Sequence, residues 1–128
     1  MQVNRFKTQF AEKVKNLDWL GGFFDGEGCI YFTDTAKAYK EKVYPEVQVI
    51  FAQSGLLGYE LMLALQAEYG TGKITSNHGS SLTKEIPYMT RISGKKAIKF
   101  LKVISPFLLL KQQKAEWVIN YMENYYAS

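Results

Sequence analysis

The sequence is poor in the residues on which many small secreted and metal-binding domains depend, with one cysteine and one histidine. Cys29 alone can form neither an intramolecular disulfide nor a cysteine-rich zinc site. His78 lies in a polar stretch, residues 77–81, that is typical of an exposed turn, so a Ser–His–Asp triad is not expected. The chain also lacks a signal-peptide core and any apolar run of about 18 residues. We therefore expect a soluble, intracellular protein without a membrane partner.

The sequence does contain enough apolar material for a core. Of its 128 residues, 47% are apolar, 15% aromatic and 22% charged. These values predict one folded domain over residues 1–128 and exclude a disordered chain. The net charge is +4, and the excess of positive charge lies in residues 71–128. This asymmetry favours one positively charged surface and, weakly, a polyanionic partner.

The apolar periodicity predicts helices that alternate with hairpins. One helix is expected in residues 1–15, and another, capped by Asn16, is expected to end in the glycines of residues 25–28. The next segments are predicted as strand, strand, helix, strand, strand, helix and helix, in residues 29–35, 44–53, 55–69, 73–77, 86–92, 95–104 and about 110–125. Together they predict an α+β domain with one sheet and helices on one of its faces.

Alternation along the strands predicts one apolar and one polar face for the sheet. In the second predicted strand, Val47, Val49 and Phe51 share the apolar face. The polar side chains expected to bind nucleic acid are Tyr31, Thr33, Thr35, Lys37, Tyr44, Glu46, Gln48, Lys73, Thr75, Asn77, Tyr88 and Thr90. Most of these types read base edges, lysines at hairpin tips suit phosphates, and a two-stranded ribbon fits the DNA major groove. An ordinary solvated face is the alternative that the pattern leaves open.

Residues 20–28, Leu-Gly-Gly-Phe-Phe-Asp-Gly-Glu-Gly, break several rules of helix formation at once. Each glycine inside a buried helix costs about 1 kcal/mol relative to alanine, which close approach of another backbone can offset. Asp25 and Glu27 then lie at the negative end of the helix dipole, where a carboxylate is unfavourable by roughly 0.3–1 kcal/mol. A carboxylate in this place can bind a divalent cation. An acidic turn with glycines for geometry alone is the other interpretation.

The nonamer closely resembles the signature of the LAGLIDADG homing endonucleases, in the variant Phe-Phe-Asp-Gly-Glu-Gly. The predicted order of elements is similar to the αββαββα core of that family, which has a saddle-shaped antiparallel sheet with helices on one face, followed here by a C-terminal helix. Residues 106–115, which begin Pro-Phe-Leu-Leu-Leu-Lys, resemble the segment with the family's active-site lysine. The resemblance covers about residues 16–125 and implies a single-motif domain of this family.

The resemblance also implies roles for individual residues. Glu27 matches the catalytic acid that binds the metal, with Gly26 beside it in the metal site. Lys111 matches the basic residue near the scissile phosphate, and Gln53 stands where several members have a solvent-organising glutamine. Some members place a second basic residue where this chain has Leu57, which leaves Arg91 and Lys114 as weak candidates for that role.

The motif helix is implied to lie at the interface between two copies of the chain, because one motif supplies one active site. The implied interface residues are Leu20, Gly21, Phe23, Phe24 and Asp25, and Gly22 is expected to allow close helix packing. Within the family, the earlier acidic position, here Asp25, is usually structural at the helix end.

The implied function is a site-specific double-strand DNA endonuclease that hydrolyses phosphodiester bonds with Mg²⁺, for which Mn²⁺ can substitute. Each long ribbon of about ten residues per strand spans roughly 33 Å, or about ten base pairs. Two copies would therefore cover a near-palindromic site of roughly 20 base pairs. The expected partners are double-stranded DNA and a second copy, with no small-molecule substrate. We expect an intron-encoded protein of a prokaryotic cytoplasm, a chloroplast or a mitochondrion.

Three other functions fit parts of the sequence. The chain could be an RNA-binding maturase that assists intron splicing, a non-catalytic DNA-binding protein of the same fold, or a small structural protein with an incidental acidic turn. The presence of both Glu27 and Lys111 favours catalysis. Four lysines, Lys95, Lys96, Lys99 and Lys102, recur along one predicted helix. Such spacing is usually a solvated face, and contacts to backbone phosphates are the secondary interpretation.

Overall fold

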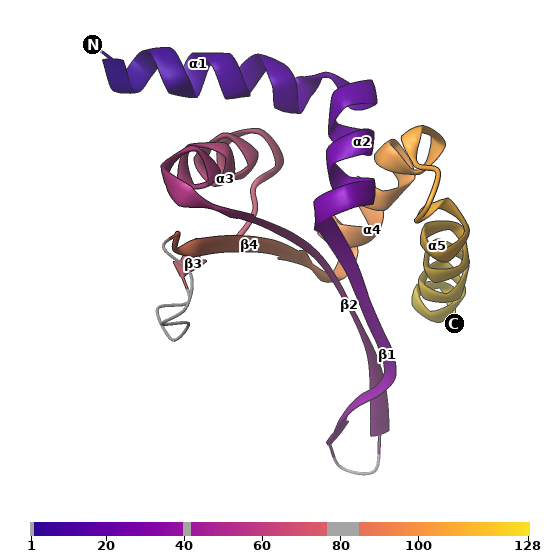
Figure 1. Ribbon diagram of the computed structural model, residues 1–128. Helices are drawn as coiled ribbons and strands as arrows, with labels where there is room; N and C mark the ends of the chain where they lie inside the picture. The colour runs from indigo at the N-terminus through magenta and orange to yellow at the C-terminus, as the bar shows by residue number, and fades with distance from the viewer. Residues whose placement is uncertain (1, 40–41, 77–84) are drawn as a thin grey trace.

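A single curved sheet with helices on one side forms the fold in the computed structural model, which describes residues 2–39, 42–76 and 85–128 (Figure 1). Side chains are described for these residues except 2–8, 35–39, 42 and 43. In chain order the elements are α1 (Gln2–Lys15), α2 (Leu17–Glu27), β1 (Gly28–Tyr39), β2 (Lys42–Ser54), α3 (Gly55–Tyr69), β3 (Thr75–Ser76), β4 (Pro87–Ser93), α4 (Gly94–Ile104), the 3₁₀ turn η1 (Ser105–Phe107) and α5 (Gln112–Ala127).

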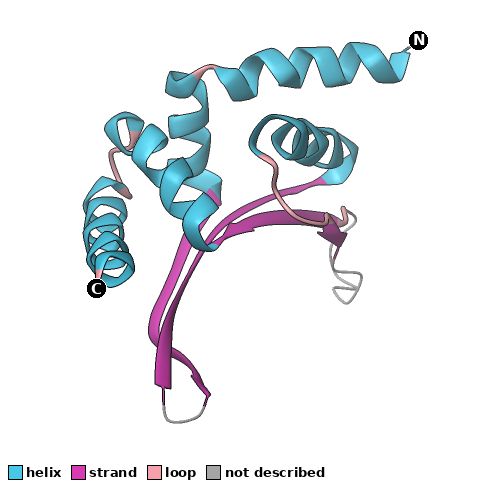
Figure 2. Ribbon diagram, turned by 180° about the vertical axis from the view of Figure 1, so that it is seen from behind, coloured by secondary structure: helices cyan, strands magenta, loops and turns pink. Residues whose placement is uncertain are grey.

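The strands pair antiparallel in the order β1-β2-β4-β3. All the helices lie on the convex side of this sheet, and the concave side is free of helices in both views (Figures 1 and 2). The predicted α+β architecture with helices on one face is therefore confirmed. We call the uncovered side the open face and the β1–β2 pair the long ribbon.

The long ribbon contains one break in its register. Pairing runs from Gly28↔Phe51 to Thr33↔Glu46 and resumes at Lys37↔Tyr44, so residues 34–36 lie opposite the single residue Pro45. Proline lacks the backbone N–H that a ladder needs and is found in sheets at such irregular positions. The strands extend further toward the tip than residues 29–35 and 44–53, the predicted limits.

The core lies between the sheet and the helices and follows the predicted alternation. Val47, Val49 and Phe51 are fully buried, and Ile30 and Ile92 extend the same face onto β1 and β4. The rings of Phe24, Phe51 and Phe100 meet at centroid distances of 5.4–5.9 Å. Edge-on ring pairs of this kind contribute beyond their buried area. The core thus ties α2 and α4 to the sheet.

Two predicted elements differ from the structure. The strand expected at residues 73–77 is described only as Thr75–Ser76, and Lys73 lies before it. The last helix begins at Gln112 rather than near residue 110, because Pro106 sits in a 3₁₀ turn and the chain at Leu108 is extended and buried. This arrangement places residues 108–111 in a loop beside the end of α2.

The N-terminal helix α1 docks on α3. Val14 is fully buried, and the hydroxyl of Tyr69 donates a hydrogen bond to the Val14 carbonyl oxygen. Within the described residues, no helix combines the length and apolar character needed to cross a bilayer.

Candidate nucleic-acid interface and active site

The nonamer forms the helix α2 and its C-terminal end. Asn16 caps the helix as predicted, because its Oδ1 accepts the N–H of Trp19 at 3.1 Å. The helix continues through Asp25 and Gly26 and ends at Glu27. Gly28 does not adopt a left-handed conformation, since its φ is −92°. Glycine is needed there because a Cβ would lie only 2.8 Å from Cγ of Phe24.

Asp25 connects this helix end to the loop before α5. Its carboxylate accepts the backbone N–H of Leu109 at 2.6 Å and that of Lys111 at 3.0 Å. Burial raises the pKa of Asp25, but the hydrogen bonds from backbone N–H groups of residues 109–111 and the charge of Lys111 outweigh it, so the net pKa is lowered. Asp25 therefore anchors the loop from within the chain.

Lys111 lies against the same helix end. Its Nζ donates a hydrogen bond to the Asp25 carbonyl oxygen and lies 6.0 Å from the centroid of the Phe24 ring. A cation at a helix C-terminus is favoured by the dipole. The structure thus places the Lys111 side chain at the C-terminal end of α2, next to Asp25 and two residues before the last helical residue, Glu27.

Glu27 is exposed at this helix end, and the backbone beside it is accessible. A Cβ on Gly26 would meet nothing within 4 Å. A carboxylate next to an open backbone segment provides oxygen donors, which Mg²⁺ prefers. Among the described residues, no group of three His, Cys, Asp or Glu side chains is arranged to hold a metal. The oxygen donors at Glu27 and Gly26 therefore fit a Mg²⁺ ion whose remaining ligands are water molecules or phosphate oxygens.

The open face contains those polar residues predicted for the long ribbon whose side chains are described, namely Tyr31, Thr33, Tyr44, Glu46 and Gln48. Tyr31 pairs with Gln48 and Thr33 with Glu46, so each pair projects from the same face. Tyr31 and Tyr44 are 43% and 40% exposed. Thr35 and Lys37 lie in β1 with side chains outside the described part, and Asn77 and His78 also lie outside it.

The prediction for β4 is wrong by one residue. Tyr88 and Thr90 share the covered face with Ile92, because side chains alternate along a strand. Tyr88 packs on Tyr59 of α3 at a centroid distance of 5.1 Å. Thr90 is 1% exposed, and its hydroxyl is hydrogen-bonded to Thr71 at 2.7 Å and to the Gly72 carbonyl oxygen at 2.8 Å. Neither side chain can contact a ligand on the open face.

Met89 and Arg91 occupy the open face of β4 instead. Arg91 donates from Nη1 to Oε1 of Gln48 at 3.3 Å, and Gln48 donates from Nε2 to Oε1 of Glu46 at 2.8 Å. This chain of contacts crosses from β4 to the long ribbon. Alternation counted back from the apolar Ile92 would have identified Arg91 as a member of the polar face.

The short strand β3 adds one predicted residue to this surface. Thr75 pairs with Met89 and is exposed on the open face. Lys73 is also exposed but precedes the strand, so the pairing does not fix its direction.

Most of the predicted interface residues of α2 lie inside the chain. Leu20 and Phe24 are fully buried in the core. Gly21 packs on η1, where an added Cβ would lie 2.8 Å from the Cβ of Phe107. The Asp25 carboxylate accepts hydrogen bonds from backbone N–H groups of the loop at residues 109–111. The assignments of Leu20, Gly21 and Phe24 to an interface between copies are corrected, whereas that of Asp25 stays a prediction, and we call Leu20, Gly21 and Phe24 the inner flank of α2.

The opposite side of α2 remains accessible. A Cβ at Gly22 would meet nothing within 4 Å, and Phe23 is half-buried. The rings of Phe23 and Trp19 stack at 5.5 Å with an interplanar angle of 4°. We call Trp19, Gly22 and Phe23 the outer flank. Trp19 was missed from sequence, although it precedes Phe23 by one helical turn.

Gln53 lies near this outer flank. It lines a hollow of about 290 Å³ between α2 and α3, together with Trp19, Phe23 and Leu57. Its Oε1 accepts the N–H of Ser54 at 3.0 Å. Gln53 pairs with Tyr88 and so belongs to the covered face of the sheet.

Comparisons with known proteins agree with this arrangement. The family model described as LAGLIDADG endonuclease matches residues 20–123. No curated protein matches the chain by sequence. The homing endonuclease I-CvuI, in complex with its target in the presence of Ca, superposes with a TM-score of 0.68 and 21% identity, over 88% of this chain and 68% of that one.

Two further structures are similar. I-CvuI in complex with the I-CreI target in the presence of Mg, with the DNA not cleaved, gives a TM-score of 0.66 at 21% identity, again over 88% and 68% of the two chains. The LAGLIDADG homing endonuclease I-SmaMI bound to cleaved DNA gives 0.66 at 15% identity, over 87% of this chain but 38% of that one. At these identities the likenesses establish the fold. The family model spans most of the chain, including the end of α2 and Lys111, and the chain belongs to the LAGLIDADG endonuclease family.

Proposed function

We propose that this chain is a site-specific double-strand DNA endonuclease that acts as a homodimer and needs a divalent cation, Mg²⁺ by the chemistry of its donors. The main supporting observation is that two side chains meet at the C-terminal end of α2. Glu27 is exposed there as the last residue of the helix, and Lys111 is hydrogen-bonded to the carbonyl oxygen of Asp25 in the same helix. The open face then extends from this point along β1, which begins at the next residue. A duplex on the open face would therefore have its backbone close to both side chains.

Each residue has a defined task in the proposed reaction. Glu27 and the backbone at Gly26 provide oxygen ligands for the cation. The Lys111 ammonium stabilises charge that develops on the scissile phosphate. Asp25 positions Lys111 through the N–H of that same residue. Mg²⁺, when bound, supplies the Lewis acidity that activates a water and stabilises the leaving oxygen.

The open face would hold the duplex. Tyr31, Thr33 and Gln48 offer donors and acceptors to base edges, and Arg91 adds a cation that can bind guanine. Arg91 already contacts Gln48. The contact fixes both side chains in the free protein, which lowers the cost of ordering them on DNA.

The outer flank of α2 supports the proposed homodimer. One chain provides one Glu27, so cutting both strands requires a second copy of the site. Gly22 leaves an open position in the middle of the flank, and Trp19 and Phe23 provide apolar surface beside it. A two-fold axis along this flank would bring the ends of two α2 helices, and so both acids, to one duplex.

The test is a comparison of Glu27→Gln with Glu116→Gln, the same change at an exposed position on α5. A target is first selected from a randomised duplex library as molecules cut in the presence of Mg²⁺. Glu27→Gln should reduce cutting by more than about 100-fold while duplex affinity stays within a few-fold, because a ligand of the cation is lost. Glu116→Gln should cut normally.

Three outcomes would contradict the proposal. Cutting by Glu27→Gln at the wild-type rate would exclude the assigned acid. A chain that sediments as a single copy on its target and nicks one strand would exclude the homodimer. Recovery of bound but never cut duplexes would favour a non-catalytic DNA-binding protein.

A further inference from the structure

Two adjacent leucines beside the candidate active site are almost fully exposed. Leu109 is 88% and Leu110 81% exposed, in the loop between η1 and α5. Single exposed leucines are ordinary on a protein surface. This pair differs because its backbone is fixed, since the Asp25 carboxylate accepts the N–H groups of Leu109 and Lys111. Contacts within the chain therefore hold the loop in place and leave both leucine side chains in water.

A largely apolar hollow lies beside the outer flank of α2. It has a volume of about 290 Å³ and is lined by Phe10 of α1, by Trp19 and Phe23 of the outer flank, and by Leu57 and Leu61 of α3. A cavity of about 150 Å³ holds a benzene molecule, which is larger than a leucine side chain. The hollow is about twice as large, so it offers space for the side chains of two leucines.

The leucine pair and the hollow lie on opposite sides of Gly22. An α-helix turns by about 100° per residue, so Asp25, which holds the loop, lies about 60° to one side of Gly22 around α2. Trp19, which lines the hollow, lies about 60° to the other side. In a dimer with its two-fold axis along the outer flank, the loop of each copy therefore faces the hollow of the other.

The outer flank alone is too small for a stable interface. Specific interfaces bury roughly 800 Å² per partner. Two aromatic side chains bury at most about 500 Å², and Trp19 and Phe23 are already half-buried within the chain. Insertion of a leucine pair into the hollow would add apolar contact on both sides of the axis, as a stable dimer requires.

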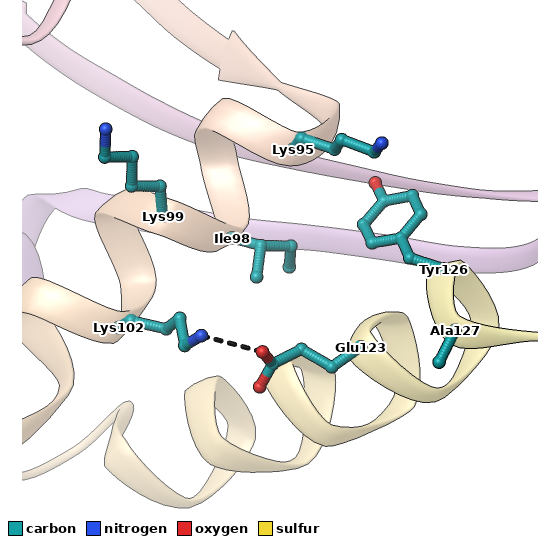
Figure 3. Close-up of a pocket in the computed structure, with 7 residues that line it drawn as sticks. All are labelled: Lys95, Ile98, Lys99, Lys102, Glu123, Tyr126 and Ala127. Carbon is teal, nitrogen blue, oxygen red and sulfur yellow. Dashed lines mark hydrogen bonds and ion pairs between the residues drawn. The ribbon is translucent and has the colours of Figure 1, made fainter.

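The groove between α4 and α5 is not an alternative receptor for the leucines. Its volume is about 440 Å³, but an ion pair of 2.7 Å between Lys102 and Glu123 joins its two walls, and two further lysines line it (Figure 3). Covering these charged groups with apolar side chains would cost free energy. The groove also lies beyond the inner flank of α2, because Phe24 packs on Phe100 of α4 at a centroid distance of 5.9 Å.

We propose, on the basis of the proposed homodimer, that Leu109 and Leu110 of each copy occupy the hollow of the other and thereby hold Lys111 in place for cutting. Lys111 directly follows the leucine pair, and its Nζ contacts the end of α2 through the Asp25 carbonyl oxygen. A loop held by Asp25 on one side and by the second copy on the other has fewer conformations than a loop held by Asp25 alone. The leucines are thus positioning residues that couple assembly to cutting.

The first experiment measures assembly of the full chain by sedimentation equilibrium. Leu110→Ala should weaken the dimer by about 100-fold, because a leucine is removed from both hollows and each lost leucine weakens association about tenfold. Since Leu110 is exposed in the single chain, the variant should fold like the wild type. Val103→Ala, which removes an exposed apolar side chain from α4, should leave the dimerisation constant within twofold.

Cross-linking tests where the leucines lie. In a Cys29→Ser background, Leu57→Cys/Leu110→Cys should give covalent dimers with bismaleimidoethane, because each linked pair of thiols comes from two copies. The exposed Cys29 is removed so that it cannot react. Neither single-cysteine variant, nor the pair Val103→Cys/Leu110→Cys, should give covalent dimers to a comparable extent.

Amide exchange tests the coupling to Lys111. The Lys111 N–H, which is donated to Asp25, should exchange more slowly as the protein concentration rises. This dependence on concentration should be lost in Leu110→Ala over the range in which the wild type dimerises. A leucine that only stabilised its own loop would not make the exchange depend on concentration.

Three results would overturn the proposal while the homodimer stands. These are wild-type dimerisation by Leu110→Ala, cross-linking of Leu110→Cys alone as efficient as that of the pair with Leu57→Cys, or exchange at Lys111 that is independent of concentration. A wild-type chain that sediments as a single copy at every concentration and on its target would instead exclude the homodimer, and the leucine contact with it. Sedimentation of the wild type therefore distinguishes the two failures.

Discussion

The two flanks of α2 are similar in residue types but differ in their surroundings. The inner flank places Leu20 and Phe24 in the core and Gly21 against η1. The outer flank exposes Gly22 between the half-buried Trp19 and Phe23. Each flank thus consists of one glycine and two large apolar residues. The inner flank is fully buried against the rest of the chain, whereas Trp19 and Phe23 pack on the core only in part and Gly22 has no neighbour within 4 Å of an added Cβ.

This difference supports the proposed homodimer, in which one helix would stabilise the fold with its inner flank and contact a second copy with its outer flank. Gly21 is required by Phe107, whose backbone leaves no space for a Cβ. Gly22 meets no such neighbour within 4 Å, so the single chain gives no reason for the loss of helix stability that a glycine brings. The proposed second copy would provide the reason, because a glycine lets two helices approach closely.

The largest expected effect is on the inner flank. Phe24→Ala should lower the free energy of unfolding by about 3–5 kcal/mol, since it removes a fully buried ring from the core. Phe23→Ala should lower the free energy of unfolding by less than half of that amount. Urea denaturation at two protein concentrations measures both. The Phe23→Ala loss should depend on concentration and the Phe24→Ala loss should not, and the opposite pattern would reverse our assignment of the flanks.

Gly21→Ala should come next, with a loss of about 1–3 kcal/mol, because the added methyl forces α2 and η1 apart. The movement should also disturb the loop at residues 109–111 next to η1. Thermal denaturation gives the first quantity, and amide exchange at Leu109 and Lys111 reports the second. An unchanged melting temperature would contradict the close packing of Gly21.

Asp25→Asn should destabilise the chain at neutral pH by roughly 1.5 kcal/mol, because a charged acceptor of two backbone N–H groups is lost. The pKa of Asp25 is lowered by folding. Its contribution is therefore fully present above the unfolded pKa of about 3.9 and is lost as the pH falls through the folded value. Urea midpoints from pH 7 to pH 2 should show a shallower acid decline for the variant than for wild type.

The smallest effect should appear at Gly22, with the opposite sign. Gly22→Ala should stabilise an isolated chain by about 0.5–1 kcal/mol, since alanine is the better helix former and space is available. The same methyl should weaken the proposed dimer, which sedimentation equilibrium measures. Unchanged self-association would remove the proposed close contact at this position.

The sequence predicted the long ribbon better than it predicted β4, for a physical reason. In β2, Val47, Val49 and Phe51 leave one possible assignment of faces, and their burial confirms it. In β4, Tyr88 and Thr90 were assigned by polarity rather than by alternation from Ile92. The buried hydroxyl of Thr90 is satisfied by Thr71 and Gly72. Hydrogen-bond partners on another segment of the chain cannot be predicted from the residues that neighbour Thr90 in sequence.

The site at the end of α2 was predictable in part. The nonamer and its resemblance located Glu27 and Lys111 in one site, and the structure brings Lys111 to the end of the helix that finishes at Glu27. Which of two adjacent glycines faces inward was not predictable, because that depends on the position of η1. The hydrogen bonds that the Asp25 carboxylate accepts from the backbone N–H groups of Leu109 and Lys111 depend likewise on a distant loop, since the partners are 84 and 86 residues apart in the chain.

The register break in the long ribbon has a consequence for how such a protein can acquire new targets. Residues 34–36 lie opposite Pro45, and pairing resumes beyond them at Lys37 and Tyr44. The distal part of the hairpin is thus separated from the rest of the ladder by an irregular segment. If the chain binds and cuts DNA as proposed, exchange of residues in that part would alter recognition at the outer base pairs while the buried core of the sheet and Glu27 stay unchanged, so this segment is the natural place to begin retargeting.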